Sequence, residues 1–170
     1  MLILRFPRLA DEAVLRLAHQ ELALDGSNFL LDGFQSNESS FEPFLKRVDD
    51  SLLGKNLVPG RVASTFLVAE VDGVIVGRSS IRHELNDWLS KFGGHIGYAV
   101  RPDFRRRGYA SEILRQSLDL AKEIGISKVL MTCNDDNIGS IKVIEKHGGV
   151  LENKVDEEGR LLRRYWINNA

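Results

Sequence analysis

The sequence predicts an α/β fold, in the α+β sense, with a mixed central sheet of six or seven strands flanked by about four helices. β-rich segments alternate with segments whose apolar residues recur at helical spacing, and one segment carries a hairpin signal. The expected order is strand, helix, helix, three strands, helix, strand, helix and two strands. No repeat or linker-like tract interrupts the chain, so we expect residues 1–170 to form a single domain.

The first part of the chain is expected to supply one strand and two helices. Residues 1–6 are rich in β-forming side chains and are followed by Pro7, whereas apolar residues fall mainly at helical spacing over residues 10–24. A second helix is expected within residues 36–54, with Gly54 as its stop signal. The segment between these two helices is expected to be an irregular loop.

A β-hairpin is expected next. Asp72 and Gly73 separate two β-rich runs within residues 64–83, and this dipeptide is the strongest short hairpin signal. Residues 83–94 are expected to form a loop or a short helical turn, and residues 95–100 another strand. Pro102 disfavours helical backbone in the residue before it and so ends that strand.

The remainder of the chain alternates helices and strands. Apolar positions from Ala110 follow one helix face as far as Gly125. Residues 128–134 are apolar on both faces, as in a strand covered by helices on both sides. Asn137 is expected to cap the next helix, and two strands follow across a turn at Gly159.

Composition excludes several classes of protein. The net charge is -1, without the basic excess of a chain that binds nucleic acid along its length. Cys133 is the single cysteine, so neither an intramolecular disulfide nor a multi-cysteine metal site can form, and no metal is expected. Without a secretory signal or an apolar run long enough to span a bilayer, the chain is expected to be cytoplasmic and free of membrane.

The loop at residues 105–111, RRRGYAS, carries the clearest chemical signal. It lies between an expected strand and an amphipathic helix, and a helix N-terminus offers free N–H groups that bind phosphate. Gly108 would let a ligand approach the backbone. The pattern R-x-x-G-x-A differs from the dinucleotide fingerprint and from the P-loop, both of which are absent. A phosphate cradle is therefore weighed against a polyanion patch and a solvated charge cluster.

This pattern, with IGYAVRP before it and KVLMTCN and NIGSIKVIEKHGG after it, resembles the GNAT superfamily of acetyl-coenzyme-A-dependent N-acetyltransferases. The resemblance covers about residues 66–150. It implies a GNAT-type acyl-CoA N-acyltransferase fold with splayed fourth and fifth strands and acetyl-CoA as cofactor. The implied activity (EC 2.3.1 type) transfers acetyl to a primary amine of a small molecule, peptide or protein by direct attack in a ternary complex. The alternative is a non-catalytic acyl-CoA-binding or sensing module.

The resemblance also assigns cofactor-binding residues. Backbone amides around Gly108 would hold the pyrophosphate, and the end of the strand at 95–100 would pair with the pantetheine arm. Asn137 is expected both to cap its helix and to touch the cofactor. The full set is Tyr98, Ala99, Val100, Arg105, Arg106, Arg107, Gly108, Tyr109, Ala110, Ser111, Asn134, Asn137 and Ser140.

Candidate catalytic residues are less well defined. His95 stands where many family members carry a glutamate and would be the general base, with a strand-end histidine as the alternative. His83 and Glu84 are further candidates, with a solvated loop as the alternative. The helix tyrosine common in the family is replaced by Ile144, so Ser140 or a water would have to protonate the thiolate.

The acceptor and the assembly stay open. The resemblance implies that acceptor choice depends on the N-terminal helices and their loop, residues 25–39, and on residues 82–94. Acidic residues in these loops could attract a cationic amine, with ordinary exposed acids as the alternative: Asp25, Asp32, Glu38, Glu84 and Asp87. A homodimer is an alternative to a monomer, because family members often pair through terminal strands. Cys133 is expected in the core, and the RRYWI tail is expected to pack rather than to stack on nucleic acid.

Overall fold

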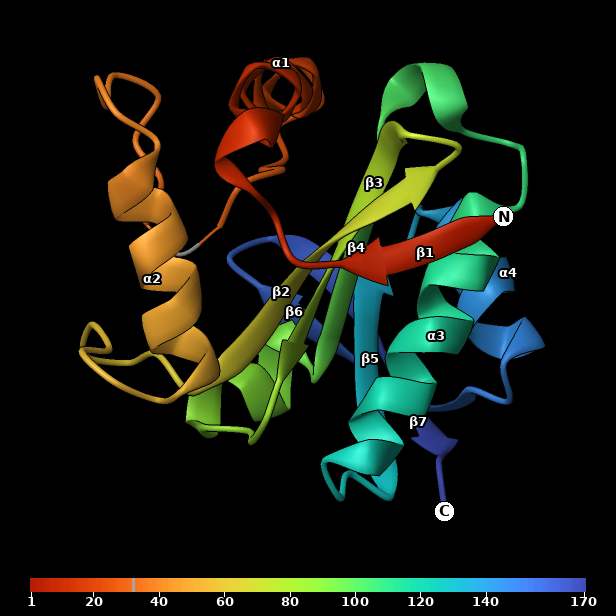
Figure 1. Ribbon diagram of the computed structural model, residues 1–170. Helices are drawn as coiled ribbons and strands as arrows, with labels where there is room; N and C mark the ends of the chain where they lie inside the picture. Colours follow the sequence, from red (N-terminus) through yellow and green to blue (C-terminus); the bar gives the residue numbers. More distant parts are fainter. Residues whose placement is uncertain (32) are drawn as a thin grey trace.

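The computed structural model describes residues 1–31 and 33–170, and it confirms the predicted fold class (Figure 1). The order of strands and α-helices is the predicted one, a short helical turn lies within residues 83–94 as expected, and two further short turns are present. The strands of the described chain are β1 (Leu2–Arg5), β2 (Ser64–Val71), β3 (Val74–Arg82), β4 (Ile96–Val100), β5 (Lys128–Asn134), β6 (Val150–Glu157) and β7 (Arg160–Asn168). The helices are α1 (Glu12–Ala23), α2 (Glu42–Leu52), α3 (Tyr109–Glu123) and α4 (Ile138–Lys146), and the turns are η1 (Leu9–Asp11), η2 (Leu89–Gly93) and η3 (Pro102–Phe104).

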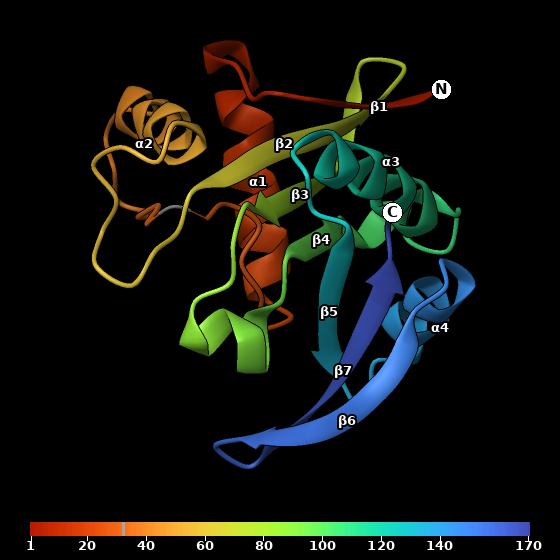
Figure 2. The same cartoon turned by 90° about the horizontal axis from the view of Figure 1, so that it is seen from below.

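The strands form two sheets rather than one continuous sheet. The first has the order β1-β2-β3-β4 and the second β5-β7-β6, and every pair within them is antiparallel. Helices α1 and α2 cover one face of the first sheet, and α3 covers the other (Figure 2). The expected mixed sheet is thus divided where β4 meets β5.

Both predicted turns have two successive residues with left-handed backbone, which glycine favours and aspartate tolerates, whereas Glu158 adopts it against its ordinary preference. Asp72 and Gly73 have φ angles of 49° and 81° between β2 and β3. Glu158 and Gly159 repeat this pair of positive φ angles, at 52° and 85°, between β6 and β7. Such turns match the twist of the flanking strands, and they fix the register of each hairpin.

The predicted face of α3 is buried. Ile113, Leu114, Ser117, Leu118 and Ala121 point toward the sheets, as their spacing predicts. Most of the apolar members join the large core between the two sheets, which also contains Cys133 and Tyr165. A second core fills the space beneath α1 and α2.

Between β4 and β5, the hydrogen bonds of the described backbone are confined to the residue before β4 and the third residue of β5. The His95 N–H donates to the Leu130 carbonyl at 2.8 Å, and the Leu130 N–H donates to Nδ1 of the His95 ring at 2.9 Å. Gly94, with φ of 68°, allows this approach, since a Cβ there would lie 2.6 Å from the Leu130 oxygen. The imidazole takes the place of a backbone acceptor, and no ladder joins the two strands beyond it in the described chain.

This junction generates a prediction about stability. In His95→Asn, the side-chain oxygen stands close to the position of Nδ1 and can still accept from Leu130. In His95→Leu, the Leu130 N–H is buried without a partner, which costs about 1–3 kcal/mol of unfolding free energy. Urea unfolding at pH 7.5 should therefore rank wild type and His95→Asn well above His95→Leu, and equal values for all three would contradict this assignment.

The same ring makes stability depend on pH. Burial, reinforced by the nearby Arg82 charge, lowers the pKa of His95 below its ordinary value of 6.5. The stabilisation from neutral His95 is therefore complete above about pH 6.5 and is lost as the pH falls below it. Burial also lowers the pKa of His19, His83 and His147, so these residues contribute to the pH dependence of both proteins. The difference between wild type and His95→Asn therefore reports the contribution of His95 alone. The asparagine variant should lose less stability between pH 7.5 and 5.

Candidate functional site

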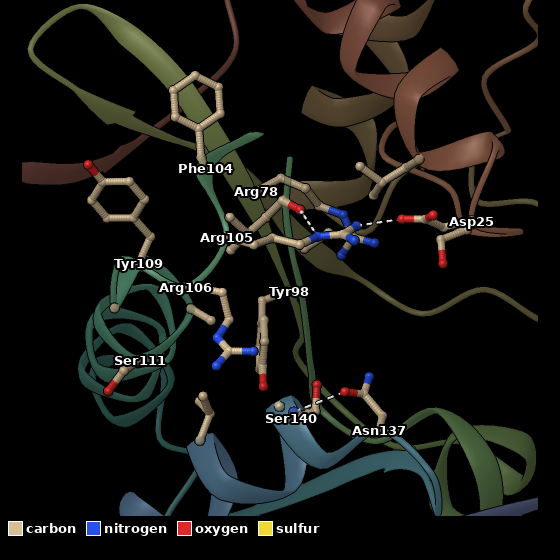
Figure 3. A pocket seen from close by; sticks show the side chains of 18 of the residues that line it. Asp25, Arg78, Tyr98, Phe104, Arg105, Arg106, Tyr109, Ser111, Asn137 and Ser140 are labelled. Carbon is tan, nitrogen blue, oxygen red and sulfur yellow. Dashed lines mark hydrogen bonds and ion pairs between the residues drawn. The ribbon is translucent and has the colours of Figure 1, made fainter. Parts of the chain in front are cut away.

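A cavity of about 760 Å³ opens where β4 and β5 have separated. Its walls come from the end of β4, the first turn of α3, the loop between β5 and α4, and the C-terminal end of α1 (Figure 3). The volume is in the range of pockets that hold small molecules and cofactors. The incomplete pairing of the two sheets is thus what creates this space.

The backbone around Gly108 forms a cradle of N–H groups. Arg106 and Gly108 both have left-handed backbone, with φ of 64° and 82°. The N-cap of α3 has no side-chain hydrogen bond, so the first-turn amides of Tyr109, Ala110 and Ser111 are offered to the cavity that these residues line. A Cβ on Gly108 would meet nothing within 4 Å, so this side of the loop is open to a ligand. The arrangement suits an anion.

The three arginines of the loop have different surroundings. Arg105 donates to the Val100 carbonyl at 3.2 Å and pairs with Asp25 of the segment after α1 at 2.6 Å. Arg106 lines the cavity. Arg107 is not part of the wall, because it donates to the Asp103 carbonyl and lies over the Phe104 ring. Every other residue predicted to bind the cofactor lies on the wall of this cavity.

The opposite wall is built around the start of α4. Oδ1 of Asn137 accepts the Ser140 N–H at 3.0 Å, which confirms the predicted helix cap. Asn134, at the end of β5, accepts the Asn137 N–H through its carbonyl at 3.0 Å. Asn134, Asn137 and Ser140 all line the cavity, so the cap and the cavity wall are the same structure.

Tyr98 on β4 presents a buried hydroxyl that has no hydrogen-bond partner among the described residues. Burial raises the pKa of Tyr98 to about 12, and the nearby Ser140 only partly opposes this shift. The hydroxyl is therefore protonated at neutral pH and remains available as a donor inside the cavity wall. A buried polar group without a partner is costly, and it commonly marks a place where a ligand completes the bonding.

The residues predicted as bases lie away from the cavity wall. His95 is 8% exposed, and its Nδ1 is occupied by Leu130. Nε2 of His83 lies 2.8 Å from the Thr65 hydroxyl, and Glu84 is exposed in the bend that follows β3. Of the predicted catalytic residues, Ser140 alone is on the wall. The base roles of His95, His83 and Glu84 stay predictions.

Of the described acidic residues predicted to attract a cationic amine, one lines the cavity and others lie away from it. Asp25 lines the cavity, whereas Glu38 pairs with Arg47 at 2.7 Å, and Asp87 is exposed with Glu84 in the loop before η2. Asp32 lies outside the described residues.

Several wall residues were not singled out by sequence reasoning. Arg78 was the one with a signal, since it is a charged residue inside the apolar run of β3. The others carry no pattern that separates them from ordinary helix or loop residues: Leu22, Ser27, Phe104, Asp136, Gly139 and Val143.

Three other expectations concern the core. Ile144, at the position of the missing tyrosine, is 1% exposed and packs in the core. Cys133 is buried, and burial raises its pKa to about 11, so the sulfur stays a thiol. In the tail, Arg163 pairs with Asp135 and Arg164 with Glu152, while Tyr165 is fully buried, as the packing interpretation predicts.

Residues 1–31 and 33–170 contain no cluster of histidine, cysteine and carboxylate side chains suited to a metal ion. None of the helices in these ranges has the length and apolar character needed to cross a bilayer.

Solved acetyltransferases share this fold. RimJ of Mycobacterium smegmatis, in complex with CoA-disulfide, superposes with a TM-score of 0.72 at 20% identity, over 98% of this chain and 81% of that chain. The yncA protein of Salmonella typhimurium, solved with acetyl-CoA, superposes with a TM-score of 0.66 at 16% identity, over 99% and 94% of the two chains.

Sequence comparisons point to the same group of proteins. YnaD of Bacillus subtilis, an uncharacterized N-acetyltransferase, is 36% identical over 61 residues, which is 34% of this chain and 36% of YnaD. YjdG of the same organism, likewise an uncharacterized N-acetyltransferase, is 34% identical over 74 residues, or 42% of this chain and 40% of YjdG. The matches thus span well under half of either relative. The family model for acetyltransferases of the GNAT type matches residues 31–149, more than half of the chain, and the protein belongs to the acetyltransferase (GNAT) family.

Proposed function

We propose that the protein transfers the acetyl group of acetyl-CoA to a primary amine by direct attack within a ternary complex. The observation that carries this proposal is the cradle of free amides at the open end of the β4/β5 notch. The family supplies the acetyl chemistry, and the structural relatives that hold acetyl-CoA or a CoA derivative support the choice of cofactor.

The wall residues fit a CoA-type molecule. The amides of Gly108 to Ser111 would hold the pyrophosphate, with Arg106 as a nearby cation. The edge of β4 that faces β5 has no ladder beyond His95, so its peptide groups at Tyr98 to Val100 can pair with the pantetheine amides. Asn134 and Asn137 would border the arm on the opposite wall.

Acetyl-CoA would supply the acetyl group as a thioester: the amine nitrogen would form the new C–N bond, the C–S bond would break, and the proton lost by the amine would pass to the sulfur through water, so that CoA leaves as the free thiol. A β4 amide would polarise the carbonyl in the manner of an oxyanion hole. Tyr98, assisted by Ser140, would donate a hydrogen bond to the departing sulfur and so take the role that Ile144 cannot fill. None of the predicted bases lines the cavity, so they have no part in this proposal.

The second candidate is a module that binds acyl-CoA without turning it over. The burial of Ile144 in place of the family's helix tyrosine favours it. Release of free thiol over a broad panel of primary amines separates the two functions. Turnover supports the transferase, whereas tight CoA binding with no turnover on any amine supports the binding module.

Gly108→Asp tests the cradle. The variant places a carboxylate beside the amides, where it competes with and repels the pyrophosphate. We expect the Kd for CoA, measured by calorimetry, to rise about 100-fold or more. Gly108→Asn is the matched control, because asparagine has the same shape and tolerates left-handed backbone but carries no charge. Equal affinities in the two variants would place the pyrophosphate elsewhere.

Tyr98→Phe tests the thiol donor. Loss of the hydroxyl should lower kcat about 10- to 100-fold, in line with a donor that acts on developing charge, and should leave KM for acetyl-CoA within about twofold. The hydroxyl has no partner in the folded protein, so its removal should not lower the melting temperature. Tyr165→Phe, a matched change in the core away from the cavity, should keep the wild-type kcat. A kcat in Tyr98→Phe equal to wild type would remove Tyr98 from the mechanism.

A further inference from the structure

Arg78 is a buried cation on the strand wall of the cavity. Its side chain enters from β3, across the cavity from α4 (Figure 3), and the residue is 9% exposed. One terminal nitrogen donates to the Gly97 carbonyl at 3.1 Å and the other to the Asn28 carbonyl at 2.9 Å. Nε is buried and finds no hydrogen-bond partner in residues 1–31 and 33–170. The guanidinium thus has donor capacity that the protein leaves unused.

No carboxylate of the described residues lies within ion-pair distance of Arg78. Other arginines of similar burial are paired: Arg101, at 8% exposed, holds Glu21 at 2.8 Å, and Arg5 holds Asp11 at 2.7 Å. Buried charges are costly and are normally paired. Arg78 is a buried charge without an ion-pair partner among the described residues, and it lines the cavity. We therefore expect it to bind an anion that comes from outside the chain.

The electrostatic surroundings sharpen this requirement. Burial, together with the charge of Arg82, lowers the pKa of Arg78 to about 9. The guanidinium groups of Arg78 and Arg82 both lie over Gly97, where an added Cβ would be 3.6 Å and 3.0 Å from their terminal nitrogens. An anion at this point would reduce the repulsion between the two cations. It would also compensate the buried guanidinium for its lost hydration.

The position of Arg78 separates it from the pyrophosphate cradle. Gly97 lies three residues before Val100 on β4, on the side away from the first turn of α3. A molecule that extends from the cradle along β4 would bring its far end, and not its phosphates, toward Gly97. The missing anion therefore belongs to the group that meets the cofactor's reactive end.

We propose that the acceptor amine carries a carboxylate and that Arg78 binds this carboxylate at the inner end of the cavity. The planar guanidinium matches a carboxylate in geometry and charge. The acceptor class is then an amino acid or a similar amine with a nearby acid group. This inference rests on the proposed transferase function and defines its second substrate.

The test compares free amino acids with their carboxamides as acceptors for the wild-type protein. The carboxamide has the less basic amine, so the intrinsic chemistry favours it, and a preference for the acid reports the anion contact. We expect kcat/KM to favour the best acid over its carboxamide about 10- to 100-fold. A ratio near one, with CoA bound and amines acetylated, would overturn the carboxylate while leaving the transferase intact. Failure of the wild-type protein to bind CoA would instead contradict the proposed function.

Variants of Arg78 provide the second arm. Arg78→Met should abolish the preference in kcat/KM for the acid over its carboxamide. Arg78→Lys keeps the positive charge but loses the planar pair of N–H donors, and it should reduce this preference. Arg115→Gln, on the exposed face of α3, is the control that should keep it. Calorimetry of the CoA-loaded protein with an N-acetylated amino acid and with its carboxamide gives the same comparison without turnover. The wild-type measurements hold even where a variant fails to fold.

A third arm distinguishes the acceptor from the cofactor as the source of the anion. CoA and dephospho-CoA differ by one phosphate, and their affinity ratio should be the same in wild type and Arg78→Met. A ratio that collapses in Arg78→Met would assign Arg78 to a cofactor phosphate and would overturn the proposal.

Discussion

The two hydrogen bonds between His95 and Leu130 are the constraint on which the rest of the structure depends. They join the two sheets at one end of β4. The imidazole accepts a backbone N–H that a strand carbonyl would accept in a continuous sheet. Gly94 is needed for the close approach, because any side chain there would collide with the Leu130 oxygen. Beyond this point each strand keeps one paired edge and one free edge. Because the two strands are hydrogen-bonded at one end only, they leave a cavity between them and peptide groups that are available to a ligand.

In the described residues, two of the three buried side-chain atoms without a hydrogen-bond partner lie at this opening, and the third, Oε2 of Glu38, lies elsewhere. The first amides of α3, the Tyr98 hydroxyl and Nε of Arg78 lack partners, and each residue involved lines the same cavity. A buried group without a partner costs about 1–3 kcal/mol, so the site is maintained against the stability of the fold. The well-packed cores on both faces of the first sheet, beneath α1 and α2 and beneath α3, offset this cost. The arrangement is typical of a site whose bonding is completed by ligands.

Local patterns in the sequence were enough for most of the fold and for the cradle. The apolar face of α3, the Asp72–Gly73 turn, the Asn137 cap and the open glycine at position 108 each depend on residues close in the chain. The rest depends on contacts across long separations. The Leu130 bond to His95 spans 35 residues, and the Arg78 bond to Asn28 spans 50. No sequence pattern around either residue specifies those partners. The sequence therefore indicated His95 as a candidate base and gave no sign of its place in the junction between β4 and β5.

The pairs that hold the C-terminal end of α1 differ in their exposure to water. Glu21 and Arg101 form a largely buried pair, with side chains 25% and 10% exposed, which mobile ions screen weakly. Asp25 and Arg105, four residues further on, are each 46% exposed, and dissolved salt screens their attraction strongly. The ion pair of the helix therefore depends only weakly on ionic strength, whereas the ion pair of the segment after it is strongest in dilute buffer. The attraction between Asp25 and Arg105 at the mouth of the cavity thus depends on the salt concentration of the solution as well as on the chain.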